Sequence, residues 1–120
     1  MLTPTDEKIN KQKPEYAEIM LFLRKHLLSY NKHMTESFKY MTICYDYKGK
    51  MVCFLHVKDD YVYLCFKTRN KLKAHPKLVS EGRKAYKAFK CFINRNIDVK
   101  SLNTILKSAC ELIDKKLMNQ

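Results

Sequence analysis

Cys65 and His56 are the pair of side chains in this chain that best fits nucleophilic chemistry. They fall in consecutive predicted strands, as diagonal neighbours on one face of a sheet. A thiol nucleophile needs a base, a group that orients the base, and donors for an oxyanion. No carboxylate on that face is placed to orient His56, and no glycine-rich turn follows Cys65. We therefore expect a protein that is not an enzyme.

The same two side chains could supply two ligands to a metal ion. A structural zinc site needs four ligands, and the remaining histidines, His26, His33 and His75, are scattered over predicted helix and loops. We do not expect a tight zinc site. Weakly bound iron stays open as a cofactor, although it prefers clustered carboxylates, which are few here.

Aromatic side chains gather around this pair on one face of the predicted sheet. The expected ligand or partner face consists of Tyr45, Phe54, His56, Tyr61, Tyr63 and Cys65. An apolar patch of this size is usually covered, by the connection after the third strand, by the N-terminal arm or by a second subunit in a homodimer. Left open, it would form a stacking platform for single-stranded nucleic acid.

The formal net charge of +12 is concentrated in one third of the sequence. Residues 67–100 hold eleven basic and two acidic side chains. Such a segment attracts polyanions, and a lysine-rich solvated surface is the alternative interpretation. The predicted polyanion-binding residues are Lys67, Arg69, Lys71, Lys73, Arg83, Lys84 and Lys87.

Hydrophobic periodicity predicts the elements that must position these residues. Apolar residues at helical spacing follow Pro14 and continue to Tyr30, and a second helical stripe follows Asp98, a good N-cap. Alternating apolar residues predict strands at 41–47, 51–58, 61–67 and 88–94. Thr35 is expected to cap a short helical turn through Lys39, and residues 68–86 to form a polar connection with a helical turn near 76–80.

The two-residue turns Lys48-Gly49 and Asp59-Asp60 predict the register of the three central strands. With Asp59 and Asp60 as the loop, Val57, Leu55 and Cys53 oppose Val62, Leu64 and Phe66 and face the core. His56 then pairs with Tyr63, and Phe54 with Cys65. The first turn would place Tyr45 and Val52 on that second face.

This order of elements predicts an α+β fold. We expect a two-layer sandwich, with an antiparallel sheet of four to five strands and the N- and C-terminal helices packed on one face. A single domain is expected at residues 13–118, after a flexible N-terminal arm at residues 1–12.

The composition points to a cytoplasmic protein without a membrane partner. No apolar run reaches the length of a membrane span, and the polar N-terminus shows no secretory signal. The five cysteines form no CxxC pair and lie within apolar runs, as expected of reduced thiols in the core.

Several segments carry a family resemblance: Glu36-x-x-Lys39-Tyr40, TICYDYKGKMVCF, YVYLCF, HPKLVSEGRKAYKAFKCF and NIDVKSLNTILKSACEL. In these segments the chain resembles the YdhG-like domain family, small bacterial proteins with an α+β fold. Some members of this family are described as frataxin-like iron chaperones. The resemblance implies a chaperone-like module that delivers iron to a receiving protein, with Glu15, Glu18 and Glu36 as the metal-binding residues. Binding of a polyanion or of single-stranded nucleic acid is the alternative.

Overall fold

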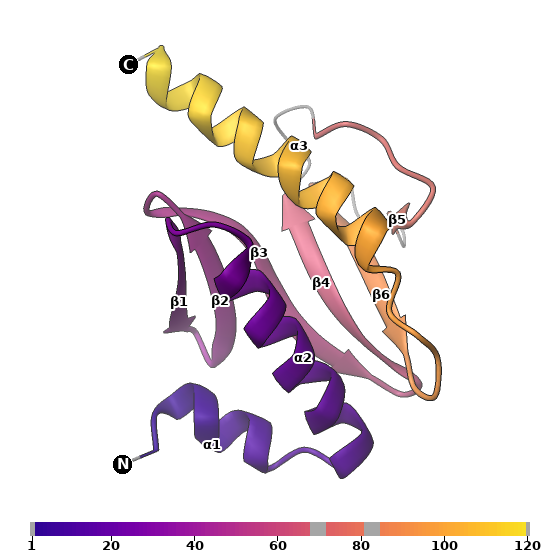
Figure 1. Ribbon diagram of the computed structural model, residues 1–120. Coiled ribbons are helices and arrows are strands. Elements are labelled where there is room, and N and C mark those ends of the chain that lie inside the picture. The colour runs from indigo at the N-terminus through magenta and orange to yellow at the C-terminus, as the bar shows by residue number, and fades with distance from the viewer. Residues whose placement is uncertain (1, 68–71, 81–84, 120) are drawn as a thin grey trace.

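The computed structural model describes residues 2–67, 72–80 and 85–119 of the 120-residue chain (Figure 1). Helices and strands follow one another in the order α1 (Pro4–Asn10), α2 (Pro14–Tyr30), β1 (Met34–Lys39), β2 (Thr42–Tyr47), β3 (Lys50–Lys58), β4 (Tyr61–Lys67), β5 (Leu78–Val79), β6 (Tyr86–Phe92) and α3 (Val99–Met118). The presence of both helices and antiparallel strands confirms the α+β class.

The six strands form one antiparallel sheet in the order β1-β2-β3-β4-β6-β5, curled into a half-barrel. Helices α2 and α3 lie in front of this sheet in Figure 1, and α1 lies below its lower edge. The predicted two-layer sandwich of four to five strands is therefore wrong. Right-handed strand twist accumulates across six strands and curls the sheet, which a count of local patterns could not reveal.

The strands missed by the sequence patterns lie at the two edges of the sheet. Residues 35–39 were expected to form a helical turn, but they belong to β1, which pairs with β2 from Met34↔Tyr47 to Lys39↔Thr42. Their alternation places Met34 and Phe38 against the core. The two-residue β5 pairs with β6 where a helical turn was expected near 76–80. Both assignments depend on a partner strand, since neither segment has a strong strand pattern of its own.

The first residues form helix α1, where the sequence suggested a flexible arm. Thr3 and Asp6 make a reciprocal capping box, in which each side chain accepts a hydrogen bond from the other residue's backbone N–H. Pro4 starts the helix, and Ile9 is only 1% exposed within the core. The capping box, the buried side chains of Thr5 and Ile9 and the ion pair of Asp6 with Arg24 hold this two-turn helix against the domain.

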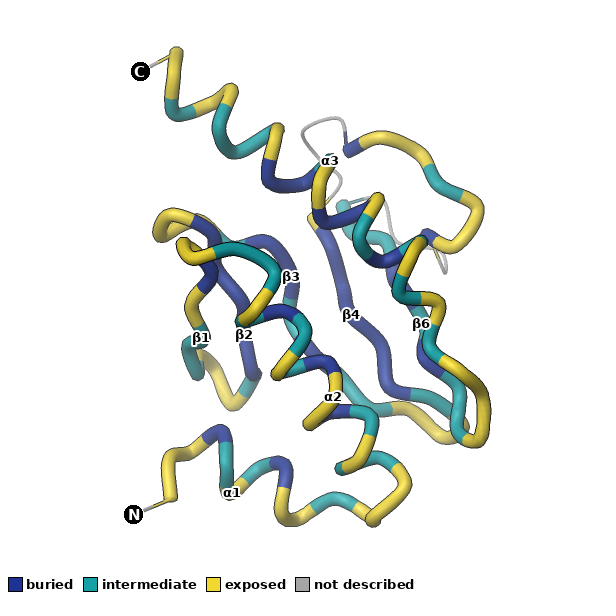
Figure 2. The backbone as a smooth tube through the Cα atoms, viewed as in Figure 1, coloured by how far each residue is buried: buried dark blue, intermediate teal, exposed yellow. Residues whose placement is uncertain are grey.

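Helices α2 and α3 begin and end close to the predicted residues. Asp98 caps α3 by accepting a hydrogen bond from the backbone N–H of Ser101 at 3.0 Å. Both helices alternate buried and exposed segments along their length, with the buried segments turned toward the sheet (Figure 2). Their buried side chains are Met20, Leu23 and Leu27 in α2 and Leu102, Ile105, Leu106, Ala109 and Cys110 in α3.

The predicted register of the β3–β4 hairpin is confirmed. Cys53 pairs with Phe66, Leu55 with Leu64 and Val57 with Val62, and these side chains belong to the main core under the helices. His56↔Tyr63 and Phe54↔Cys65 point to the opposite face of the sheet. We call this second surface the outer face.

A β-bulge at Val52 overturns the predicted position of Tyr45. Asp46 pairs with Met51, but Tyr45 pairs with Cys53, so the pairing skips Val52. One extra residue reverses which side chains face the core, because alternation along a strand has a period of two. Tyr45 is 0% exposed and Val52 also lies in the main core, whereas both were predicted on the outer face.

The turn between β1 and β2 holds two bulky residues in the left-handed conformation. Tyr40 has φ 51° and Met41 has φ 62°, and their exposed fractions are 99% and 73%. Two-residue hairpin turns of this kind favour Asn-Gly, because a Cβ atom is strained at positive φ. The turn therefore costs folding free energy that no core contact of these two side chains offsets.

Replacing Met41→Gly is expected to raise the free energy of unfolding by about 0.5–1 kcal/mol, because the strain at positive φ disappears with the Cβ atom. Urea denaturation measures the change. Met41→Ala is the matched control: it removes the exposed side chain but keeps the Cβ atom, so it should give no gain. Equal stabilisation by both variants would contradict the strain argument.

All five cysteines are buried as free thiols. Burial raises the pKa of Cys91 to about 12 and that of Cys110 to about 11, and it raises the pKa of Cys53 strongly. A thiol reacts as its thiolate, so burial and a raised pKa both slow reaction.

The native protein at pH 7.5 should therefore react slowly with a disulfide reagent such as dithionitrobenzoate. We expect five thiols to react promptly in 6 M guanidinium chloride. Rapid reaction of one thiol without denaturant would show that its burial is wrong or that a segment over it opens readily.

Candidate functional site

The outer face is the side of the sheet opposite the helices. Figure 1 shows α2 and α3 in front of the sheet and α1 below its lower edge, so α2 and α3 cover the other face. Tyr63, Cys65 and Ala88 are buried at its centre, and Phe54, Tyr61 and Tyr86 pack around them as half-buried rings. The outer face thus has a small apolar core of its own.

Six rings on the outer face form one continuous chain of contacts, which we call the aromatic track. Its members, in order of contact, are Phe92, Tyr61, Tyr63, His56, Phe54 and Tyr86. Successive ring centroids are 5.2, 5.7, 5.5, 5.0 and 5.5 Å apart. The His56 ring is stacked on Tyr63, while Phe54 meets His56 and Tyr86 edge-on.

The register of the three central strands explains the shape of the track. Lys67 pairs with Tyr86, and Cys65 with Ala88, so β6 lies next to β4 throughout. The small side chains of Cys65 and Ala88 let the Tyr86 ring reach Phe54 across β4. The rings therefore surround a small-residue centre instead of forming a straight row.

Positive charge dominates the polar residues of the outer face. Strand alternation places Lys39, Lys58, Lys67 and Lys90 on it, and Asp46 is its one acidic strand residue among the described residues. Asp46 is 8% exposed and accepts a hydrogen bond from the hydroxyl of Ser37. The Lys90 ammonium lies 4.8 Å from the centre of the Tyr61 ring, a cation–π contact.

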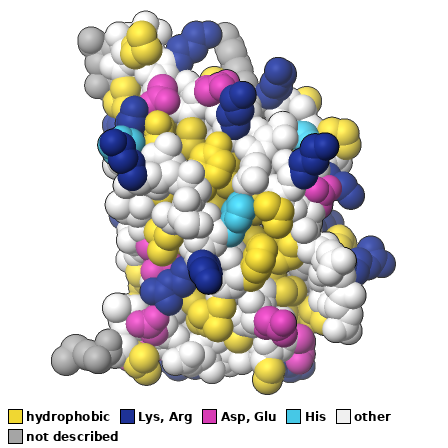
Figure 3. Space-filling view, in the orientation of Figure 1, with side chains coloured by type: hydrophobic (Ala, Val, Ile, Leu, Met, Phe, Trp, Pro, Cys, Tyr) yellow, Lys and Arg dark blue, Asp and Glu magenta, His cyan; other side chains and the backbone are white. Residues whose placement is uncertain are grey.

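The opposite side of the molecule has a different charge pattern. Figure 3 views the helix-bearing side, where acidic and basic side chains are interspersed. Ion pairs there include Arg24 with Asp6 and Lys48 with Asp114. The described strands of the outer face thus carry four lysines and one carboxylate, and Asp59 and Asp60 lie in the turn that follows Lys58.

Of the six residues that the sequence predicted for the ligand or partner face, five lie on the outer face, and several further members of that face were not predicted. Phe54, His56, Tyr61, Tyr63 and Cys65 lie on the outer face, while Tyr45 is in the core. The missed members, Tyr86, Phe92, Lys58 and Lys90, alternate along strands in the right phase. The alternation of Lys90 against Phe89 and Cys91 was a usable signal, but the sequence did not show that β6 pairs with β4.

The predicted polyanion-binding residues do not gather on one surface. Lys67 is exposed on the outer face, whereas Lys87 pairs with Phe66, on the helix-bearing side of the sheet. The backbone N–H of Lys73 hydrogen-bonds to the Ser108 hydroxyl of α3 at 3.4 Å. The remaining four, Arg69, Lys71, Arg83 and Lys84, lie outside the described residues.

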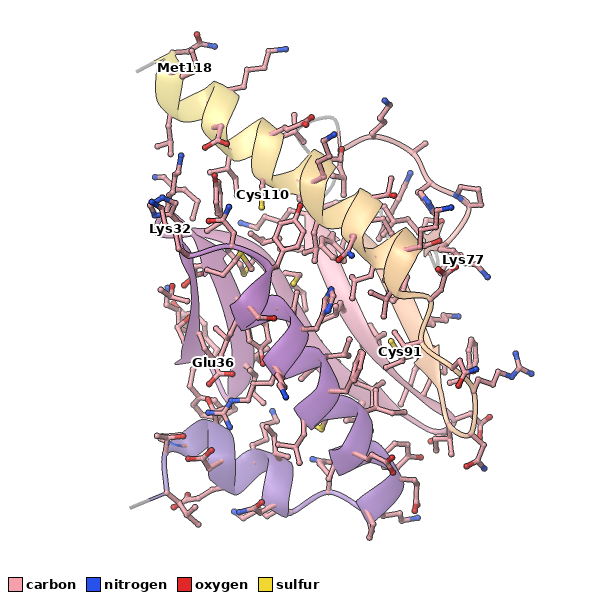
Figure 4. All side chains as sticks on the ribbon, viewed as in Figure 1. Lys32, Glu36, Lys77, Cys91, Cys110 and Met118 are labelled. Carbon is pink, nitrogen blue, oxygen red and sulfur yellow. The ribbon has the colours of Figure 1, made fainter. Side chains whose placement is uncertain are left out.

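Glu36, one of the three predicted metal ligands, is engaged in a structural network. Its carboxylate accepts hydrogen bonds from the Tyr45 hydroxyl at 2.9 Å and pairs with the Arg24 guanidinium at 3.0 Å. Arg24 also pairs with Asp6 at 2.7 Å. Figure 4 shows Glu36 on β1, on the side of the sheet that α2 covers. This network ties α1, α2 and β1 together.

Burial and hydrogen bonding shift the pKa values of three members of this network. Burial raises the pKa of Tyr45 well above its usual value, with the Glu36 charge adding to the effect. The backbone hydrogen bond from Thr3 and the hydrogen bond from Arg24 lower the pKa of Asp6 to about 2. Asp6 in turn raises the pKa of Arg24. At neutral pH, Tyr45 and Arg24 are therefore protonated and Asp6 is ionised.

Glu15 and Glu18 lie apart from Glu36. They are exposed on the first turns of α2, six to nine residues before Arg24, which corresponds to about 9–14 Å along the helix axis. Both line a cleft of about 540 Å³ with the connection between β6 and α3. Within residues 2–67, 72–80 and 85–119, no three His, Cys, Asp or Glu side chains are grouped so as to hold a metal ion.

Comparisons with known proteins leave the family open. No family model, no curated protein and no solved structure matches the chain. The YdhG-like resemblance therefore stays a prediction from the sequence. In the described part of the chain, the helices are all too short or too polar to span a bilayer.

Acid should weaken the Asp6 network in a defined pH window. A carboxyl whose pKa is lowered on folding stabilises the protein above its unfolded pKa of 3.8, and that contribution is lost as the pH falls toward about 2. Asp6→Asn should therefore lower the free energy of unfolding at pH 5, and the difference from the native chain should shrink between pH 4 and 2.

Urea denaturation at stepped pH values measures this difference. Glu7→Gln is the matched control, because Glu7 lies on the same helix and forms no ion pair in the described structure. A deficit of Asp6→Asn that stays constant from pH 5 to 2 would contradict the assigned pKa.

Proposed function

We propose that this protein binds single-stranded nucleic acid on the outer face of its sheet, without catalysing a reaction. The observation that carries the proposal is the aromatic track lying among four lysines and one carboxylate on a face that no helix covers. Single strands expose unstacked bases, which stack on aromatic rings, and phosphates, which lysines neutralise.

The aromatic track supplies rings at two levels of burial. Tyr63 is buried, whereas Phe54, His56, Tyr61, Tyr86 and Phe92 are half-buried, so the accessible rings form the rim of the track. Their mutual contacts restrict rotation, and a ring that is already ordered loses little entropy when a base packs on it. Stacking of this kind tolerates any base sequence, because every base has a π-face.

The lysines are distributed around the track rather than within it. Lys58 ends β3 opposite Tyr61, and Lys67 ends β4 opposite Tyr86. Lys90 lies over the Tyr61 ring. Phosphates of a strand whose bases stack on the rim would therefore meet ammonium groups at both ends of the track.

Charge also argues against a homodimer through this face. A two-fold symmetric interface places the same patch on both subunits, so the outer-face lysines of one copy would oppose those of the other. Among the described strand residues of this face, each copy offers one nearly buried carboxylate, Asp46, against four lysines. Bringing these ammonium groups together and out of water is costly, while a polyanion would neutralise them.

Fluorescence anisotropy with labelled fifteen-nucleotide dT and rU strands tests the proposal. We expect binding at 20 mM salt that weakens steeply as salt rises, with a log–log slope of about −2 if three lysines contact phosphates. The DNA and RNA strands distinguish the two kinds of nucleic acid. Absence of any anisotropy change at low salt would overturn the proposal.

Two pairs of variants separate the outer face from net charge and from general stability. The double variant Lys58→Gln with Lys67→Gln should weaken binding about tenfold and make the affinity less dependent on salt. The control, Lys100→Gln with Lys107→Gln, removes the same charge from exposed positions of α3 and should weaken binding less. Tyr61→Leu should cost about 1–3 kcal/mol of stacking free energy, whereas Tyr30→Leu on the helix-bearing side should leave binding unchanged. If an outer-face variant and its control lose the same affinity for the strand, the outer face is not the binding site.

A further inference from the structure

The cleft beside the start of α2 adjoins one end of the aromatic track. Its walls come from the first turns of α2, with Glu15, Glu18 and Phe22, and from the connection between β6 and α3, with Phe92 and Arg95. Its volume of about 540 Å³ is in the range of small-ligand pockets and exceeds that of one nucleobase. The two walls come from segments at least 70 residues apart in the sequence.

Phe92 connects the cleft with the outer face. Its ring contacts Tyr61, the first step of the aromatic track, at 5.2 Å, and it also lines the cleft. The guanidinium of Arg95 lies 5.2 Å from the centre of the same ring. A strand that follows the track past Tyr61 would therefore deliver its next base to the mouth of the cleft.

The chemistry of the cleft differs from that of the lysine-rich face. Glu15 and Glu18 are exposed, stand three residues apart on one side of α2, and form no ion pair among the described residues. Carboxylates repel phosphate but accept hydrogen bonds from N–H groups. Phe22 and Phe92 add apolar surface against which a flat ring can pack. These walls suit a base with its phosphate held outside.

Guanine is the nucleobase whose hydrogen-bond donors match a carboxylate. Its Watson–Crick edge presents two adjacent donors, N1–H and the N2 amino group, to the two oxygens of one carboxylate. Adenine and cytosine place an acceptor beside their amino group, and uracil and thymine flank one N–H with two carbonyl oxygens. Proteins commonly read unstacked bases of single strands through this edge.

We propose that this cleft binds one guanine base at the end of a single strand that lies on the aromatic track. Glu15 or Glu18 accepts the two guanine donors, and Phe22 and Phe92 pack against the ring. The inference rests on the proposed function and adds base preference to it. It assigns the two glutamates to base recognition, where the sequence had suggested iron.

Competition anisotropy with ten-nucleotide dT strands that carry one terminal guanine, adenine or hypoxanthine tests the inference. The guanine strand should bind about tenfold more tightly than plain dT. Hypoxanthine, which lacks the N2 amino group, should lose most of this preference. The guanine is placed at either the 5′ or the 3′ end, and one of the two placements should carry the effect.

The variant Glu15→Gln with Glu18→Gln should abolish the guanine preference and leave binding of plain dT intact or slightly tighter. Glu111→Gln, exposed on α3, is the charge control and should retain the preference. Equal affinity for the guanine and plain dT strands, or a preference that survives in the double variant, overturns the cleft assignment while the proposed function stands. Absence of binding to every strand overturns both.

Discussion

The pairing of β3 with β4 is the constraint on which the rest of the structure depends. The turn at Asp59 and Asp60 places Lys58 opposite Tyr61, and every later pair follows from that step. Apolar aliphatic side chains then meet the helices, and aromatic ones meet the opposite side. A slip of one residue would exchange these two sets, bury His56 under the helices and expose Leu55, at a large cost in hydrophobic free energy.

The bulge at Val52 is the second constraint, because it turns the side chain of Tyr45 into the core and away from the outer face. Because Tyr45 turns inward, its hydroxyl meets Glu36, and Glu36 then pairs with Arg24 of α2. The same step turns Asp46 outward, to Ser37. A side chain expected to recognise a partner thus stabilises the fold, and a glutamate expected to bind metal neutralises an arginine. Glu15 and Glu18 in the cleft have no ion-pair partner among the described residues, so their carboxylates can accept hydrogen bonds from a ligand.

Physical reasoning from local pattern succeeded where the determining contacts are near in sequence. Helix α3 was predicted from a cap and a stripe of apolar residues, and β3–β4 from a two-residue turn and alternation. It failed for β1, whose strand conformation comes from pairing with β2, and for β5, which consists of two residues held by β6. The first helix was missed because its capping box, Thr3 with Asp6, lies in a polar stretch that composition alone assigns to a loose arm.

Local patterns in the amino-acid sequence were enough to predict the α+β class, the two long helices, which side chains of the central hairpin share a face, and the excess of positive charge. These properties depend on periodicity, capping and turn chemistry, which act over a few residues. Long-range pairing, visible only in the folded chain, sets β6 beside β4, adds Tyr86 and Phe92 to the two ends of the aromatic track, and makes Phe92 line the cleft beside the start of α2. Such neighbours are far apart in sequence, and they are brought together by the burial of the whole core.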